Sequence, residues 1–142
     1  MPGTISDQAL WLTTPLAVPA GLSNARLSFG QQYSFPVDGN GNDAGGVLEV
    51  STDGGTTWAD AGAAILAGLY TGPISAANGN PLGGRSGWVG SNGGVWTVVL
   101  VNLLPWSGQS IQFRCRLGTD LSPGAGWWHV DNAAVTFGTI CP

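Results

Sequence analysis

Apolar and polar residues alternate along much of this chain with the period of two that is typical of β-strands. Residues 25–35 (ARLSFGQQYSF) and 110–118 (SIQFRCRLG) place an apolar side chain at nearly every second position. Because successive side chains of a strand point to opposite faces, both segments predict strands with one buried and one exposed face. Residues 95–103 (VWTVVLVNL) are almost continuously apolar, which predicts a strand covered on both faces.

The last predicted strand, residues 127–137, changes its pattern halfway. Trp128 and Val130 share one face, whereas Val135 further along has the opposite parity. Because a strand changes face only through an extra residue, this pattern predicts a β-bulge at residues 131–132.

Turn signals locate the remaining elements. Residues 45–62 (GGVLEVSTDGGTTWADAG) contain an Asp-Gly pair at the centre, which predicts a β-hairpin because its turn needs positive φ. Residues 59–69 are compatible with one short helical turn, and two glycines argue against a longer helix. Residues 71–94 show little pattern, and a loop of this length is expected to be functional or disordered.

Glycine-rich turns between short strands define the expected fold class. The chain has 24 glycines and 9 prolines, and helical periodicity is nearly absent. We therefore expect an all-β fold, a two-sheet antiparallel β-sandwich of the jelly-roll type with less than a tenth of helix. At 142 residues, the chain 1–142 is expected to form a single domain, which we interpret as a piece of a longer exported protein.

The charges argue against two classes of partner. The chain has four arginines, no lysine and a net charge of −4, so it lacks the basic face that nucleic acid requires. No apolar run approaches the roughly 20 residues of a membrane-spanning helix. The two cysteines, Cys115 and Cys141, are expected to form a disulfide in an oxidising compartment. The alternative is two unrelated buried thiols.

The order of several motifs resembles a known group of domains. Across residues 10–137, the motifs follow one another in this order: LTTPLAV, ARLSFGQQYSF, GGVLEVSTDGGTTWADAG, YTGPI, PLGGRSGWVG, VVLVNLLPWSGQSIQFRCRLGTD and GWWHVDN. Together they resemble the jelly-roll β-sandwich that is appended to bacterial secreted proteins, especially peptidases. That family is similar to MAM adhesion domains and to calcium-containing carbohydrate-binding modules. The resemblance implies a non-catalytic accessory domain of a secreted or cell-surface protein.

The resemblance also implies a structural calcium ion. Its expected ligands are Asp131 of the last strand, together with Glu49 or Asp43. The chain departs from the family pattern near Pro36, where an acidic residue is usual, and Asp43 is displaced by one residue. Calcium prefers a mixture of carboxylate and carbonyl oxygens, which a bulge provides. The alternative is that Asp131 accepts backbone N–H bonds at the bulge without a metal.

The remaining candidate residues are one histidine and several tryptophans. His129 has no partners at metal or catalytic spacing and is expected to face outward from its strand, so no enzymatic activity is expected. Flat rings on loops bind sugar faces, and Trp88, Trp106 and Trp127 are the candidates for ligand binding. The alternative is that these rings pack under glycine-rich loops.

Two classes of function follow from these observations. The first is an extracellular binding module that recognises a glycan or a protein partner. The second is a structural spacer or a self-assembling surface domain without a ligand. Binding that is lost when a candidate tryptophan is replaced would favour the first class, and regular self-assembly without ligand would favour the second.

Overall fold

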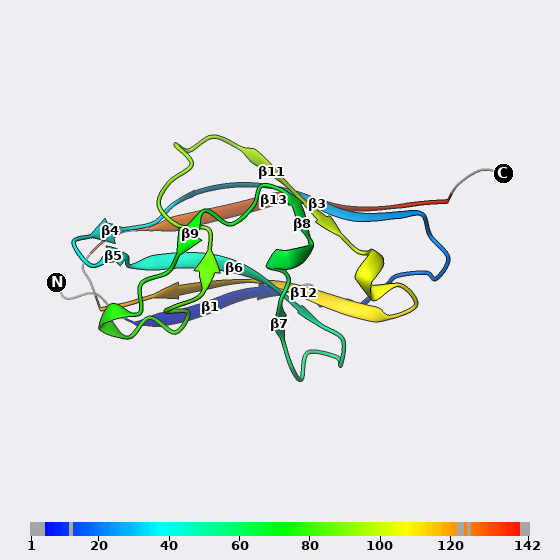
Figure 1. Cartoon of the computed structure of the whole chain (residues 1–142), viewed down its shortest axis with the longest axis horizontal. Coiled ribbons are helices and arrows are strands. Elements are labelled where there is room, and N and C mark those ends of the chain that lie inside the picture. The colour runs from blue at the N-terminus through cyan, green and yellow to red at the C-terminus, as the bar shows by residue number, and fades with distance from the viewer. Residues whose placement is uncertain (1–4, 12, 122–123, 125, 140–142) are drawn as a thin grey trace.

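A computed structural model describes residues 5–11, 13–121, 124 and 126–139, and it confirms an all-β fold (Figure 1). The helical segments of these residues are short 3-10 turns: η1 (Gly62–Ala64), η2 (Ala77–Gly79) and η3 (Leu104–Trp106). The first of them is the helical turn predicted within residues 59–69.

The strands form two main antiparallel sheets. The first, here named the β6 sheet, has the order β1-β12-β6-β7 with β2 beside β12, and the second, the β3 sheet, has the order β13-β3-β11-β8. The β6 sheet comprises β1 (Ser6–Trp11), β2 (Leu16–Ala17), β6 (Ala44–Ser51), β7 (Ala59–Asp60) and β12 (Ser110–Thr119). The β3 sheet comprises β3 (Asn24–Ser34), β8 (Ile65–Ala67), β11 (Thr97–Asn102) and β13 (Trp127–Gly138). Two short ribbons pair β4 (Val37–Asp38) with β5 (Gly41–Asn42) and β9 (Gly72–Pro73) with β10 (Ser86–Gly87).

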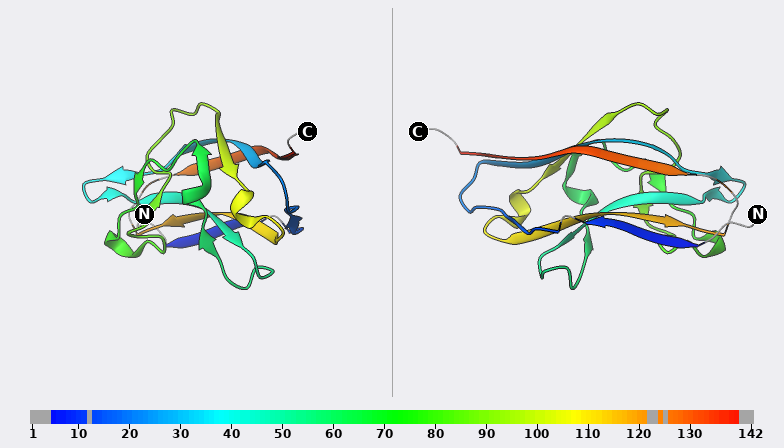
Figure 2. Two further views of the ribbon diagram at one scale, coloured as in Figure 1. Left: turned by 45° about the vertical axis from the view of Figure 1, so that its right-hand side comes forward. Right: turned by 180° about the vertical axis from the view of Figure 1, so that it is seen from behind.

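The two main sheets pack face to face as a β-sandwich. One buried core joins side chains of both sheets, among them Leu27 and Phe29 of β3, Leu48 of β6 and Phe113 of β12. Seen from behind, β13 and β1 run along the same side of the molecule as the edges of the two layers (Figure 2). The jelly-roll type of the sandwich stays a prediction.

The predicted hairpin is confirmed. β6 and β7 pair antiparallel, with Glu49 opposite Asp60. The turn between them holds Gly54 and Gly55 at φ values of +75° and +89°, a conformation that glycine adopts without steric cost.

The segment 71–89 covers the outer face of the β6 sheet. Its side chains Ile74, Leu82 and Val89 are buried against Val47 of β6 in a second, smaller core. The glycine-rich segment expected to be a functional or disordered loop is therefore packed and partly strand-forming in this part, and it crosses the front of the molecule in Figure 1.

The outer face of the β3 sheet is exposed, which corrects the expectation for β11. Side chains alternate along β11, so that Val99 is fully buried but Val98 is 60% exposed. The continuous apolar run therefore does not reflect cover on both faces. Trp96, just before this strand, is 50% exposed as well.

The predicted β-bulge is confirmed in β13. The register against β3 shifts between Asp131, which lies opposite Gly30, and Ala134, which lies opposite Ser28. Within the bulge, Asn132 has a φ of +56°, a left-handed conformation that asparagine tolerates better than most residues.

The predicted disulfide falls partly outside the described residues, because Cys141 lies there. Cys115 belongs to β12 and packs against the core. Burial raises the pKa of its thiol to about 12. The pairing of the two cysteines stays a prediction.

Candidate functional site

A short loop, residues 90–96, rises above the upper layer in Figure 1. At its end, Trp96 lies on the outer face of the β3 sheet. Asn92 fixes this loop to β3: its Oδ1 accepts from the Tyr33 backbone N–H (3.0 Å), and its Nδ2 donates to the Gln31 carbonyl (3.3 Å). Gly93 and Gly94 have positive φ and allow the chain to turn back into β11.

The Trp96 ring lies on the sheet beside Gln32. An added Cβ at Gly30 would lie 3.4 Å from Trp96 Cε3, so the ring stands over this glycine. In one orientation of the Gln32 amide, both of its polar atoms have a hydrogen-bond partner. Oε1 then accepts from Trp96 Nε1–H (3.2 Å), and Nε2 donates to the Gly94 carbonyl (2.8 Å). These bonds hold the indole in place while one side of it faces solvent.

Trp127 and His129 continue the same face on β13. Their ring centroids are 5.0 Å apart, and Trp127 is 38% exposed. His129 lies opposite Gln32 in the register, with its Nδ1 3.4 Å from the Gln32 amide. His129 therefore faces outward, as predicted. We call this surface the aromatic face; it consists of Trp96, Gln32, His129 and Trp127.

The other two predicted ligand-binding tryptophans lie elsewhere. Trp88 is only 1% exposed, and its Nε1–H donates to the Gly68 carbonyl (2.8 Å). A buried ring offers no face to a ligand, so the interpretation of Trp88 is corrected to that of a core residue, which packs edge-on against Phe29 and Tyr70. Trp106 is half-buried in η3 and packs edge-on against Phe113 at 5.9 Å. Trp128, beside Trp127, packs against the core, as predicted.

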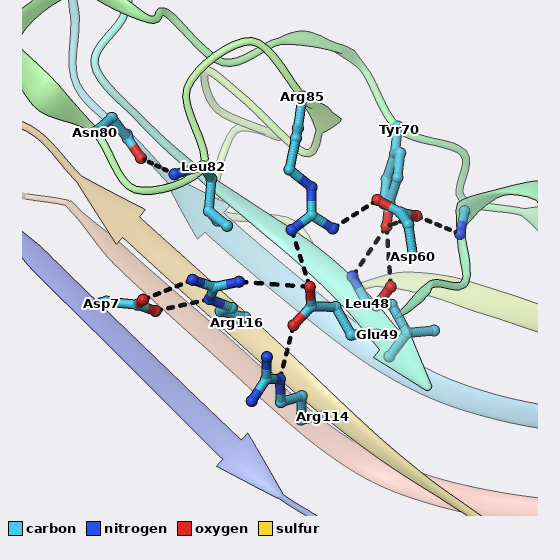
Figure 3. Close-up of polar contacts among 11 residues, drawn as sticks. Asp7, Leu48, Glu49, Asp60, Tyr70, Asn80, Leu82, Arg85, Arg114 and Arg116 are labelled. Carbon is cyan, nitrogen blue, oxygen red and sulfur yellow. Dashed lines mark hydrogen bonds and ion pairs between the residues drawn. The ribbon is translucent and has the colours of Figure 1, made fainter. Parts of the chain in front are cut away.

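Glu49, a predicted calcium ligand, is held by three arginines on the outer face of the β6 sheet (Figure 3). Its carboxylate accepts from Arg85 (2.9 Å) and Arg114 (2.7 Å), and Arg116 Nη1 lies 3.5 Å away. Burial alone would raise the pKa of the Glu49 carboxyl, but the hydrogen bonds from Arg85 and Arg114 outweigh it and hold the pKa below its ordinary value. Glu49 therefore forms a largely buried ion pair with Arg114, and Arg116 lies close to the same carboxylate.

Asp43, the second predicted ligand, is buried just before β6. It is 3% exposed, and its Oδ1 has no hydrogen-bond partner among the described residues. Burial, a hydrogen bond with Asp38 and the nearby charge of Asp120 raise the pKa of Asp43 to about 6.

Asp131, the third predicted ligand, lies at the bulge and is exposed. Its Oδ1 accepts a hydrogen bond from the Asn132 backbone N–H (2.7 Å), which is the capping role considered as the alternative. The described residues contain no group of three or more His, Cys, Asp or Glu side chains arranged to hold a metal ion.

The surroundings of Glu49 do not favour a calcium ligand, whereas the calcium ion held by Asp131 together with Glu49 or Asp43 otherwise stays a prediction. The oxygens of Glu49 are occupied by guanidinium groups, whose positive charge repels a cation.

Sequence reasoning missed two central residues of the aromatic face, Trp96 and Gln32. Gln32 lies in a predicted strand, and its outward position follows from the alternation of that strand. Trp96 was not among the predicted ligand-binding tryptophans, and it lies within residues 95–103, which were expected to be covered on both faces. The one signal that pointed to this place is Gly30, because glycine inside a strand marks a bulge or a close approach.

Comparison with known proteins gives no family for this chain: no family model matches it, and no curated protein matches it either. None of the helical segments in the described part of the chain has the length and apolar character needed to cross a membrane.

Proposed function

We propose that this chain is a non-catalytic glycan-binding module of a secreted or cell-surface protein, and that the aromatic face binds the glycan. The observation that carries this proposal is the pairing of two partly exposed indoles, Trp96 and Trp127 (50% and 38% exposed), with the amide of Gln32 and the imidazole of His129.

The chemistry of the aromatic face matches the two sides of a sugar ring. Sugar rings have apolar C–H faces that stack on tryptophan and a rim of hydroxyl groups that form hydrogen bonds. Trp96 and Trp127 provide the apolar surfaces, and the polar groups of Gln32 and His129 lie between them.

The spacing of the strands favours an oligosaccharide over a single sugar. β13 and β11 both pair with β3, so their backbones are about 9–10 Å apart at the usual strand spacing. Trp127 on β13 and Trp96 beside β11 can then each contact a different ring of one glycan. The ligand is expected to lie across the three strands.

Binding to immobilised oligosaccharides, followed by calorimetry on the best binder, tests this function. Trp96→Ala and Trp127→Ala are each expected to weaken binding about tenfold or more, which corresponds to about 1.4 kcal/mol. Trp11→Ala is the matched control, because Trp11 is similarly exposed (46%) but belongs to β1 of the other sheet. It is expected to bind as the wild type does.

Absence of oligosaccharide binding by the folded wild-type chain would contradict the proposal. Regular self-association of the chain under the same conditions would then support the alternative, a structural or self-assembling surface domain. Equal losses of affinity in all three variants would show that the substitutions act by destabilising the fold and not by removing contacts of the aromatic face.

A further inference from the structure

A hollow lies on the outer face of the β3 sheet, directly beside the aromatic face. Its volume is about 320 Å³, at the lower end of the range of about 300–1,000 Å³ that is usual for small-molecule sites. It is lined by Ser28, Phe29, Gly30, Trp96, Thr97, Val98 and Asn132.

Gly30 lines the hollow and has no side chain that would reduce it. Its neighbours on the same face of β3, Ser28 and Gln32, both carry one. The backbone does not require glycine here: Gly30 is absent from the residues with positive φ. An added Cβ would make ordinary contacts, 3.4 Å from Trp96 Cε3 and 3.6 Å from the Asp131 carbonyl oxygen. Glycine therefore allows the Trp96 ring to lie close to the strand at this position and is not required for a turn.

The lining of the hollow is uncharged and has two chemical sides. Trp96 and Val98, 50% and 60% exposed, form an apolar wall on the β11 side. Ser28 provides a hydroxyl group, and the bulge brings Asn132 to the opposite border. A compact ring with an apolar face and a hydroxyl rim fits both sides, and this describes a sugar unit better than a purely apolar molecule.

The charges around the hollow select against anions. Asp131 directly precedes Asn132 and lies opposite Gly30 in the register, and the chain as a whole carries a net charge of −4. A carboxylate on the bound ring would be repelled by this carboxylate and would find no cation among the described residues of the lining.

We propose that the hollow over Gly30 is the subsite for one uncharged sugar ring of the bound oligosaccharide, stacked on Trp96. The proposal rests on the glycan-binding function above and deepens it: it names the class of sugar and the place of one ring. The rest of the glycan extends towards Trp127.

Filling the hollow tests the subsite without replacing either tryptophan of the aromatic face. Gly30→Val places two methyl groups in the hollow, and a β-branched residue suits a strand. Gly138→Val is the matched control, because Gly138 belongs to the same pair of strands but lies at their far end, opposite Asn24. Gly30→Val is expected to lower the affinity for a neutral oligosaccharide at least tenfold, whereas Gly138→Val is expected to leave it unchanged.

The ligand side is tested with pairs of oligosaccharides that differ only in whether one unit is a neutral hexose or its uronic acid. Wild-type protein is expected to bind the neutral member at least tenfold more tightly. Equal or tighter binding of the uronic acid would overturn the proposal. If Gly30→Val fails to fold, Ser28→Ala replaces it, with an expected loss of about threefold.

The outcomes of these experiments distinguish a failure of the proposed subsite from a failure of the proposed function. If Trp96→Ala and Trp127→Ala weaken binding but folded Gly30→Val does not, the glycan-binding function stands and the subsite is overturned. If the wild type binds no oligosaccharide at all, the function itself fails, and the subsite fails with it.

Discussion

At the scale of single residues, Glu49 shows how a polar side chain is accommodated inside this fold. Its side chain is 4% exposed and shared among three arginines. Arg114, one of them, also lies 4.4 Å from the centroid of the Trp58 ring. Two of these arginines come from β12, whereas Arg85 comes from the segment that covers the β6 sheet. The Glu49 carboxylate therefore links segment 71–89 to the β6 sheet.

Removing the charge of Glu49 is expected to destabilise the protein strongly. Glu49→Gln leaves three guanidinium groups around a neutral amide, and loss of one partner of a buried ion pair typically costs about 3–5 kcal/mol. The control is Asp7→Asn, whose partly exposed pair with Arg116 is expected to contribute less than about 1 kcal/mol. Urea unfolding of both variants measures the difference. Equal losses would show that the Glu49 cluster contributes no more than a surface pair.

At the scale of the elements, the bulge in β13 has two structural effects. It reverses which face of the strand is buried, so that Val130 before it and Val135 after it both pack against the core. It also turns Asn132 to the border of the hollow. Asp131 satisfies the backbone N–H of this left-handed residue, which explains an acidic residue at this position without a metal.

A substitution of Asp131 distinguishes its capping role at the bulge from the role as a calcium ligand that the resemblance implies. Asp131→Ala is expected to lower the free energy of unfolding by about 0.5–1.5 kcal/mol, the usual contribution of one hydrogen bond. Because the bond needs no ion, the loss should be the same in calcium and in chelator. Thermal unfolding of wild type and variant under both conditions measures this. A loss that appears only in calcium would support the metal site instead.

At the scale of the whole molecule, the stability is expected to depend on pH through Asp43. Burial, Asp38 and Asp120 raise the pKa of its carboxyl to about 6 in the folded state, against an ordinary value of 3.8. The folded protein therefore binds more protons than the unfolded chain between these two pH values, and stability falls as pH rises through this window. Above about pH 6 the cost of the buried charge is fully present.

Unfolding at several pH values tests this expectation. The free energy of unfolding of the wild type is expected to fall by roughly 1 kcal/mol between pH 5 and pH 7. Asp43→Asn, which carries no charge, should flatten this slope and be the more stable protein at pH 7. Asp7→Asn is the control: the pKa of Asp7 is lowered, so its contribution is already constant above about pH 5. A slope that survives in Asp43→Asn would assign it to another group.

Some features of the candidate site follow from the local sequence, and others depend on the tertiary structure. The outward position of His129 and the packing of Trp128 against the core follow from strand alternation alone. The exposure of Trp96 and the burial of Trp88 do not, because both lie beside glycine-rich turns whose path no local pattern specifies. Reasoning from residue type therefore found one tryptophan of the aromatic face, Trp127, and missed the other.

The sequence by itself determined part of the local structure: strands β3, β11, β12 and β13, the hairpin at Asp53-Gly54 and the bulge at Asp131. These features depend on side-chain parity and backbone preferences within a few residues. Only the tertiary structure decided which faces are covered. Segment 71–89 folds over the β6 sheet and supplies Arg85 to Glu49, while the β3 sheet keeps its outer face exposed. The physical reason is that cover comes from contacts between residues far apart in the chain, and alternation within one strand is the same whether its second face meets water or another segment.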